Sequence, residues 1–176
     1  YEGRSGNLER PSLILGKAPF SSHPNRGLTM KIIAVLLTIL GLTTPALAEK
    51  TTVNQTFFGN VAISGTDPVA YFLEGKAAEG RSEFSHQWDG ANWHFKSEEN
   101  RDAFAKSPET YAPQFGGYCA WAVSQGYTAP IDPAAWSIVD EKLYLNYSKD
   151  VRAQWSQDIP GNIARGIANW PGVLGD

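Results

Sequence analysis

The 176-residue chain has little cysteine, little methionine and few basic residues. Because Cys119 is its only cysteine, an internal disulfide and a Cys-x-x-Cys dithiol cycle are excluded. The chain has 15 Lys and Arg against 18 Asp and Glu, with no basic cluster. Nucleic acid and anionic membranes are therefore poor partner classes.

The motifs of several enzyme classes are also missing. The sequence has no glycine-rich phosphate loop, no G-x-S-x-G nucleophile elbow and no H-E-x-x-H pair. Asp67, Asp132 and Asp140 are interpreted as caps and turn residues rather than acid–base pairs. The sequence shows neither an internal repeat nor a low-complexity segment. It establishes no reaction and favours a protein that is not an enzyme.

The segment 1–48 is predicted to lie outside the folded domain. Residues 1–29 precede the only methionine, Met30, and are interpreted as upstream, non-native sequence. Residues 30–48 have the parts of a cleaved signal peptide, namely Lys31, an apolar run over residues 32–42, and small residues at Ala46 and Ala48. The apolar run is shorter than the roughly 20 residues that a membrane-spanning helix needs. We therefore expect a periplasmic or secreted protein without stable membrane insertion.

Residues 49–176 are predicted to form one α+β domain, in which two β-hairpins are interleaved with short helices. This segment has ten basic and sixteen acidic residues, a net charge of −6, and it contains all six tryptophans. Such an aromatic content is typical of a packed core or of a lined pocket.

The clearest local pattern is a hairpin over residues 84–95. Asp89-Gly90 lies between two runs that alternate aromatic and polar residues, which is typical of a two-residue turn. This turn predicts three cross-strand pairs: Trp88 with Ala91, His86 with Trp93, and Phe84 with Phe95. The paired aromatic residues and His86 then share one face, and His94 lies on the other.

Capping and turn residues predict the other elements. Asp67 and Ser97 each begin a helix, and residues 118–123 form a short helix. The remaining predictions are a strand within residues 57–63, a second hairpin over 136–147 with its turn at 140–142, a helix over 149–158 capped by Ser148, and a last helix after Pro160 with Ile163, Ile167 and Trp170 on one stripe.

With these elements the chain resembles the YHS domain, and most closely the exported group of YHS domain-containing (seleno)proteins. The resemblance covers residues 67–111 through Asp67-Pro68-Val69, Phe84-Ser85-His86 with Gly90, His94-Phe95 with Ser97, and Phe104, Pro108 and Tyr111. It implies a link to heavy-metal handling, with copper or zinc as the ligand. Ala70, Lys96 and Asn100 stand where metal-transport members have cysteines, so that thiolate set is missing.

Two side chains are candidate functional groups. His86 is either a buried ring, packed among the aromatic residues and hydrogen-bonded to backbone, or a metal ligand or proton carrier. Cys119 is either a buried, inert thiol or a redox thiol, because the predicted helix start after Gly116-Gly117 would lower its pKa. The candidate binding residues are His86, Trp88, Trp93, Tyr118 and Cys119, and His86 and Cys119 are the candidate metal ligands.

The leading hypothesis is an exported binding or accessory module of YHS type. Its partner would be an unidentified protein, small molecule or metal ion. The alternative is a single-thiol redox protein that acts through Cys119, by way of a sulfenate or a mixed disulfide with a partner.

Overall fold

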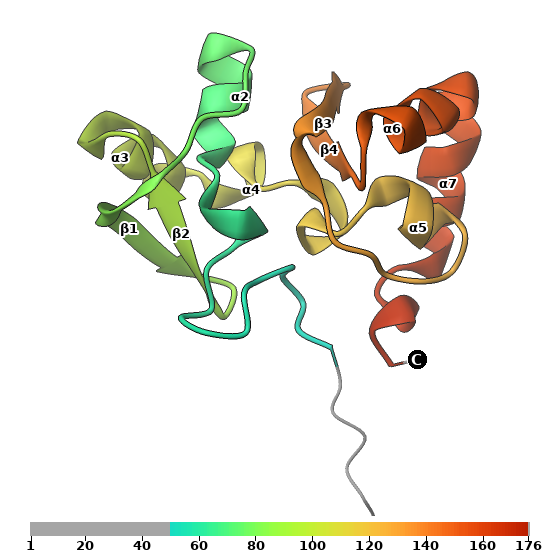
Figure 1. Cartoon of the computed structure of the whole chain (residues 1–176), viewed down its shortest axis with the longest axis horizontal. Helices are drawn as coiled ribbons and strands as arrows, with labels where there is room; N and C mark the ends of the chain where they lie inside the picture. Colours follow the sequence, from blue (N-terminus) through green and yellow to red (C-terminus); the bar gives the residue numbers. More distant parts are fainter. Residues whose placement is uncertain (1–49, 176) are drawn as a thin grey trace, which may run out of the picture. The chain divides into compact units, whose positions relative to one another are not determined.

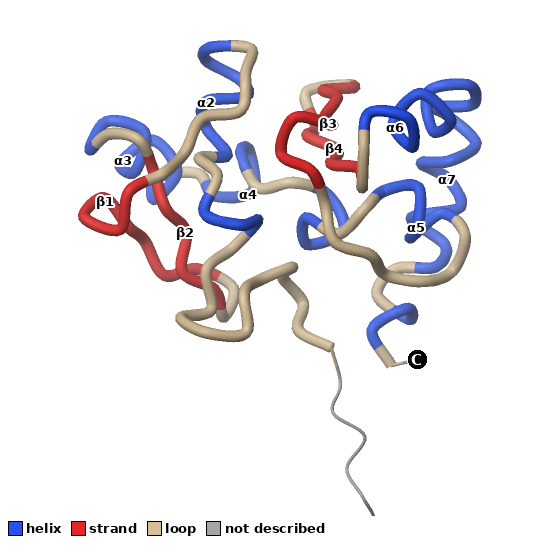
Figure 2. Tube along the Cα trace, in the orientation of Figure 1, coloured by secondary structure: helices blue, strands red, loops and turns tan. Residues whose placement is uncertain are grey.

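The computed structural model describes residues 50–175 (Figure 1). The predicted upstream segment 1–29 and signal peptide 30–48 lie outside the described residues. Within residues 50–175, no helix is both long and apolar enough to cross a membrane. The described chain is a small α+β domain with two separate two-stranded antiparallel sheets and several short helices (Figure 2), which confirms the predicted fold class.

The elements follow one another in two similar series. The first series runs η1 Ile63–Gly65, α2 Pro68–Glu74, β1 Arg81–Trp88, β2 Ala91–Phe95, α3 Glu98–Lys106 and α4 Pro108–Tyr111. The second runs η2 Gln114–Gly117, α5 Ala120–Ser124, β3 Asp132–Val139, β4 Lys142–Asn146, α6 Lys149–Trp155, η3 Ser156–Asp158, α7 Ile159–Asn169 and η4 Gly172–Leu174.

The β1–β2 hairpin has the predicted two-residue turn. Asp89 and Gly90 both have positive φ angles, 47° and 74°, as a type I′ turn requires. The pairs Trp88 with Ala91 and His86 with Trp93 are confirmed. The predicted pair of Phe84 with Phe95 is wrong, because a register shift between Arg81 and Ser85 places Arg81 opposite Phe95.

The β3–β4 hairpin has the same form. Its turn is Asp140-Glu141, with φ angles of 49° and 59°. This turn is one residue shorter than predicted, because Lys142 already pairs with Val139. A register shift follows at the same distance from the turn, between Asp132 and Trp136.

The two halves of the domain form an internal structural repeat, which corrects the expectation of no repeat. Every cross-strand residue pair of the first hairpin has a counterpart in the second hairpin, always the same number of residues further along the chain. For example, the pair of Arg81 with Phe95 corresponds to the pair of Asp132 with Asn146. After each hairpin a serine begins a helix, and its hydroxyl accepts from the N–H three residues on: Ser97 from Asn100 and Ser148 from Val151. Figure 1 shows one copy around β1 and β2 and the other around β3 and β4.

The repeat is hidden in the sequence because its copies keep structural roles rather than residue types. Between residues 81–106 and 132–157 only three positions are identical: Asp89 and Asp140, Ser97 and Ser148, and Arg101 and Arg152. At some buried positions the second copy has an aromatic ring of another kind. Phe104 in α3 and Trp155 in α6 are both fully buried.

Each copy has its own hydrophobic cluster. In the first, Trp93 and Phe95 of β2 lie 5.1 Å from Phe104, measured between ring centroids. In the second, Tyr144 of β4 lies 5.3 Å from Trp155. Aromatic rings at these separations contribute about 0.5–1.5 kcal/mol per pair beyond the area that they bury.

Helix α7 packs against the second copy through a surface that differs from the predicted stripe. Its buried residues are Asn162 and Gly166, whereas Ile167 is 63% exposed. A Cβ atom built on Gly166 would lie 2.5 Å from Cζ of Phe115. The lack of a side chain at residue 166 therefore allows the helix to lie close to that ring.

The start of the described chain forms a loop rather than the predicted strand. Residues 57–63 make only isolated bridges, such as Val61 with Asn92. Phe57 and Phe58 are 90% and 83% exposed. Helix α6 also ends three residues earlier than expected, at Trp155, where a short 3-10 turn takes over.

Candidate functional site

His86 lies on the predicted aromatic face. Its ring centroid is 6.2 Å from that of Phe104, and the ring of Trp88 is 5.8 Å from the same phenylalanine. The side chain is half-buried rather than buried. His86 thus packs at the edge of the first cluster, as the structural interpretation expected, without the predicted burial.

A metal centre is not assembled within the described chain. Among residues 50–175, no three His, Cys, Asp or Glu side chains form a group that could hold a metal ion. His86 belongs to the first copy of the repeat and Cys119 to the second. A copper or zinc ligand at either residue stays a prediction.

Cys119 is the N-cap residue of α5 and is only 1% exposed. Its Sγ accepts a hydrogen bond from the backbone N–H of Tyr147 at 3.3 Å. Burial raises the pKa of this thiol, and hydrogen bonds from neighbouring N–H groups oppose that rise. The expectation of a lowered pKa is therefore wrong, because desolvation exceeds the effect of those N–H groups.

A buried amide lies beside the thiol. Asn146, at the end of β4, is fully buried, and its Oδ1 lies 3.9 Å from Sγ of Cys119. The same oxygen accepts from the N–H of Trp121 at 3.2 Å. Its Nδ2 has no hydrogen-bond partner among the described residues.

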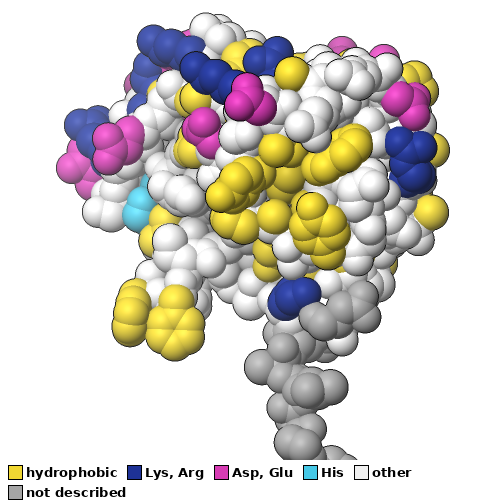
Figure 3. Space-filling view, turned by 45° about the vertical axis from the view of Figure 1, so that its right-hand side comes forward, with side chains coloured by type: hydrophobic (Ala, Val, Ile, Leu, Met, Phe, Trp, Pro, Cys, Tyr) yellow, Lys and Arg dark blue, Asp and Glu magenta, His cyan; other side chains and the backbone are white. Residues whose placement is uncertain are grey.

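Cys119 also lines a shallow surface hollow of about 250 Å³. The other lining residues are Trp121, Ala122, Tyr127, Ala129, Tyr147 and Val151. Tyr127 and Tyr147 are 51% and 55% exposed. Figure 3 shows hydrophobic side chains gathered on the face of the molecule that this view turns forward.

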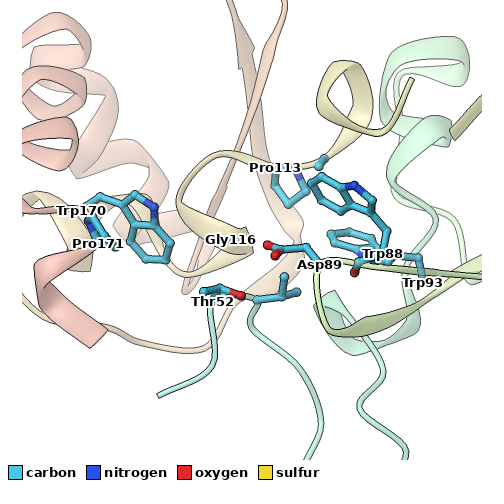
Figure 4. A pocket seen from close by; sticks show the side chains of 10 residues that line it. Thr52, Trp88, Asp89, Trp93, Pro113, Gly116, Trp170 and Pro171 are labelled. Carbon is cyan, nitrogen blue, oxygen red and sulfur yellow. The ribbon is translucent and has the colours of Figure 1, made fainter. Parts of the chain in front are cut away.

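A second concave feature is a groove between the two copies of the repeat, which we call the tryptophan groove. It consists of two adjoining cavities of about 310 and 360 Å³ that share Trp88, Ala112, Pro113 and Trp170. Figure 4 shows Trp88 and Trp93 on one side of the first cavity and Trp170 on the other.

The wall formed by the first copy is fixed by its hairpin. Trp88 and Trp93 lie on the same face of β1 and β2, with ring centroids 5.9 Å apart. The indole Nε1 of Trp93 donates to the backbone oxygen of Trp88 at 3.0 Å. Trp93 is buried and Trp88 half-buried, so Trp88 presents the accessible ring.

The opposite wall is Trp170, the C-cap residue of α7. Its ring centroid lies 6.2 Å from those of both Phe115 and Tyr118. The preceding residue, Asn169, donates through Nδ2 to the backbone oxygen of Val123 at 2.9 Å. These contacts hold the indole in place beside the groove.

The charges around the tryptophan groove have one sign. Asp89 lines the first cavity and Glu109 the second. Within the described chain, no lysine, arginine or histidine is among the lining residues of either cavity. The arrangement is that of an apolar site with a small number of acidic groups.

The structure divides the predicted binding residues among several places. Trp88 and Trp93 line the tryptophan groove, whereas His86 and Cys119 do not. Tyr118 packs behind Trp170, and its hydroxyl donates to the backbone oxygen of Thr51 at 2.9 Å. The residue that sequence reasoning missed is Trp170, which it treated as purely structural.

Comparisons of the chain with protein-family models, curated proteins and solved structures found no match.

Proposed function

We propose that the chain is an exported binding module of YHS type and that its ligand binds in the tryptophan groove. The observation that carries this proposal is the pair of aromatic walls, Trp88 from one copy of the repeat and Trp170 from the other, with an open space between them. Both cavities have a volume in the range of small-molecule sites, about 300–1,000 Å³.

The groove favours binding over covalent catalysis. Its described lining residues include no serine, cysteine, histidine or lysine. Activated serine, cysteine and lysine nucleophiles and a histidine base are therefore missing from the described lining. Apolar walls with two carboxylates are sufficient to bind and orient a ligand.

A neutral fluorescent probe tests the site in the purified full chain. We expect N-phenyl-1-naphthylamine to bind with increased fluorescence and the Trp170→Ala variant to weaken binding by about tenfold or more. Trp121→Ala is the matched control, because Trp121 is half-buried and lines the other hollow. Equal binding by the Trp170→Ala variant and the wild type would contradict the proposal.

A single-thiol redox role for Cys119 is the second candidate. It is favoured by the position of Sγ, which receives the N–H of Tyr147 and lines an apolar hollow. In this reaction a hydroperoxide oxidises the thiol to a sulfenic acid and is itself reduced to an alcohol or to water. Dimedone trapping after peroxide treatment, measured by intact mass, tests it; an unmodified folded chain contradicts it.

A further inference from the structure

Among residues 50–175, the charged side chains that line the tryptophan groove are all acidic. The carboxylate of Asp89 points into the space between Trp170 and the Trp88–Trp93 pair (Figure 4). Glu109 lines the adjoining cavity. Because no cationic side chain lines either cavity in the described chain, the groove favours a cation and disfavours an anion.

The walls of the groove are also suited to a cation. Indole has the strongest cation–π attraction of the natural aromatic side chains. Trp88 and Trp170 approach the same cavity from opposite sides, with Trp93 behind Trp88. A cation in this cavity can therefore lie against the indole of either wall.

The mostly apolar lining selects among cations. A primary ammonium group carries three N–H donors that need acceptors once water is removed. A quaternary ammonium group has no donor, so it loses less when it enters an apolar site. Around Trp88, the groove consists largely of alanine, proline and aromatic side chains.

We infer that the tryptophan groove binds a small organic cation of the quaternary ammonium class, between Trp88 and Trp170 and beside Asp89. This inference rests on the proposed function, since it names the ligand class of the same groove. The volume of the first cavity, about 310 Å³, accommodates a trimethylammonium group with a short chain.

Choline and its neutral carbon isostere, 3,3-dimethylbutan-1-ol, form a matched pair of probes. They have nearly the same shape and differ in charge. We expect the purified full chain to bind choline about tenfold or more tightly than the isostere, as measured by calorimetry. Equal affinities would overturn the cation inference.

The Asp89→Asn variant removes the negative charge of residue 89 without changing the conformation of the turn. Asparagine is well suited to the positive φ of a type I′ turn, so the hairpin is retained while the charge is removed. We expect choline to bind about threefold to tenfold less tightly to this variant and the neutral isostere to bind unchanged.

Asp140→Asn is its control, because Asp140 has the same turn position in the second copy, with φ of 49°, and does not line the groove. Wild-type affinity for choline in the Asp89→Asn variant overturns the role of the carboxylate.

The outcomes distinguish the two proposals. Binding of the naphthylamine probe and of the isostere, without a preference for choline, overturns the cation inference and leaves the groove as a binding site. Binding of none of the three probes overturns the inference and the proposed function together.

Discussion

In the second copy of the repeat, Cys119 takes the place that Asp67 has in the first. Each is the N-cap residue of a short helix, and each donates its backbone N–H to an alanine oxygen, that of Ala78 or Ala129. Oδ2 of Asp67 accepts from the N–H of Lys96 at 3.0 Å, and Sγ of Cys119 accepts from that of Tyr147, the counterpart of Lys96, at 3.3 Å. Equivalent backbone N–H groups therefore donate to a carboxylate in the first copy and to a thiol in the second.

Asp67→Asn should destabilise the domain by about 3 kcal/mol, because an amide nitrogen in place of Oδ2 would leave two donors unsatisfied. Oδ2 of the buried Asp67 accepts from the N–H of Lys96 and from Nδ2 of Asn100, at 3.0 and 2.7 Å. Urea denaturation measures the change, and Asp150→Asn, at an exposed helix start, should cost less than about 1 kcal/mol. Similar costs for the two variants would contradict the assigned role of Asp67.

Cys119 should react slowly with alkylating reagents in the folded chain. Burial raises the pKa of its thiol, so the reactive thiolate is scarce at neutral pH. We expect iodoacetamide, followed by intact mass, to modify the native chain much more slowly at pH 7.5 than the urea-unfolded chain. Equal rates would show that the thiol is accessible and would strengthen the redox alternative.

Gly166→Ala should destabilise the domain by about 1–3 kcal/mol, because its Cβ would meet the ring of Phe115. Alanine normally stabilises a helix by about 1 kcal/mol relative to glycine, so a loss identifies the steric clash. Gly172→Ala is the control, since a Cβ there meets no atom within 4 Å. A stabilising Gly166→Ala would contradict the close packing of α7.

Stability should fall at alkaline pH because of Tyr71. This tyrosine is 1% exposed, its hydroxyl donates to the oxygen of Pro133 at 2.9 Å, and burial raises its pKa above the ordinary value. The contribution of the protonated ring is fully present below the unfolded-state pKa of about 10 and decreases as pH rises above it.

The Tyr71→Phe variant tests this assignment. Its free energy of unfolding, measured by urea denaturation between pH 8 and 11, should be lower at pH 8 by about 1 kcal/mol, because the hydrogen bond to Pro133 is lost. It should then decline less steeply than that of the wild type above pH 10. An unchanged alkaline decline would contradict the assignment to Tyr71.

Much of the fold could be predicted from local patterns. Asp89-Gly90 determined the turn and two of the three cross-strand pairs, and Asp67, Ser97 and Ser148 are the caps that their positions indicated. The pair of Phe84 with Phe95 was wrong because a register shift at the far end of β1 has no local sequence mark. The side chains at the turns and helix starts were therefore sufficient to predict those features. They were not sufficient to predict the register shift within β1.

The proposed binding site was only half predictable from the sequence. Trp88 and Trp93 stood out because they lie in the alternating pattern of one hairpin. Trp170 lies far away in the sequence and lines the same cavity only because the two copies pack together. The repeat could not be recognised in the sequence, because equivalent residues such as Phe104 and Trp155 are both buried but differ in type. The lowered pKa predicted for Cys119 was wrong because the sequence left open whether the thiol is buried, and in the fold it is buried.

Binding of a cation in the tryptophan groove can be followed through the indole N–H signals of the full chain in an ¹H–¹⁵N spectrum recorded with increasing choline. Single Trp→Phe variants assign the six signals. We expect the signals of Trp88 and Trp170 to shift with choline and the signal of Trp155, which is fully buried elsewhere, to stay unchanged. Unchanged signals for Trp88 and Trp170, or shifts confined to Trp121 in the other hollow, would contradict it.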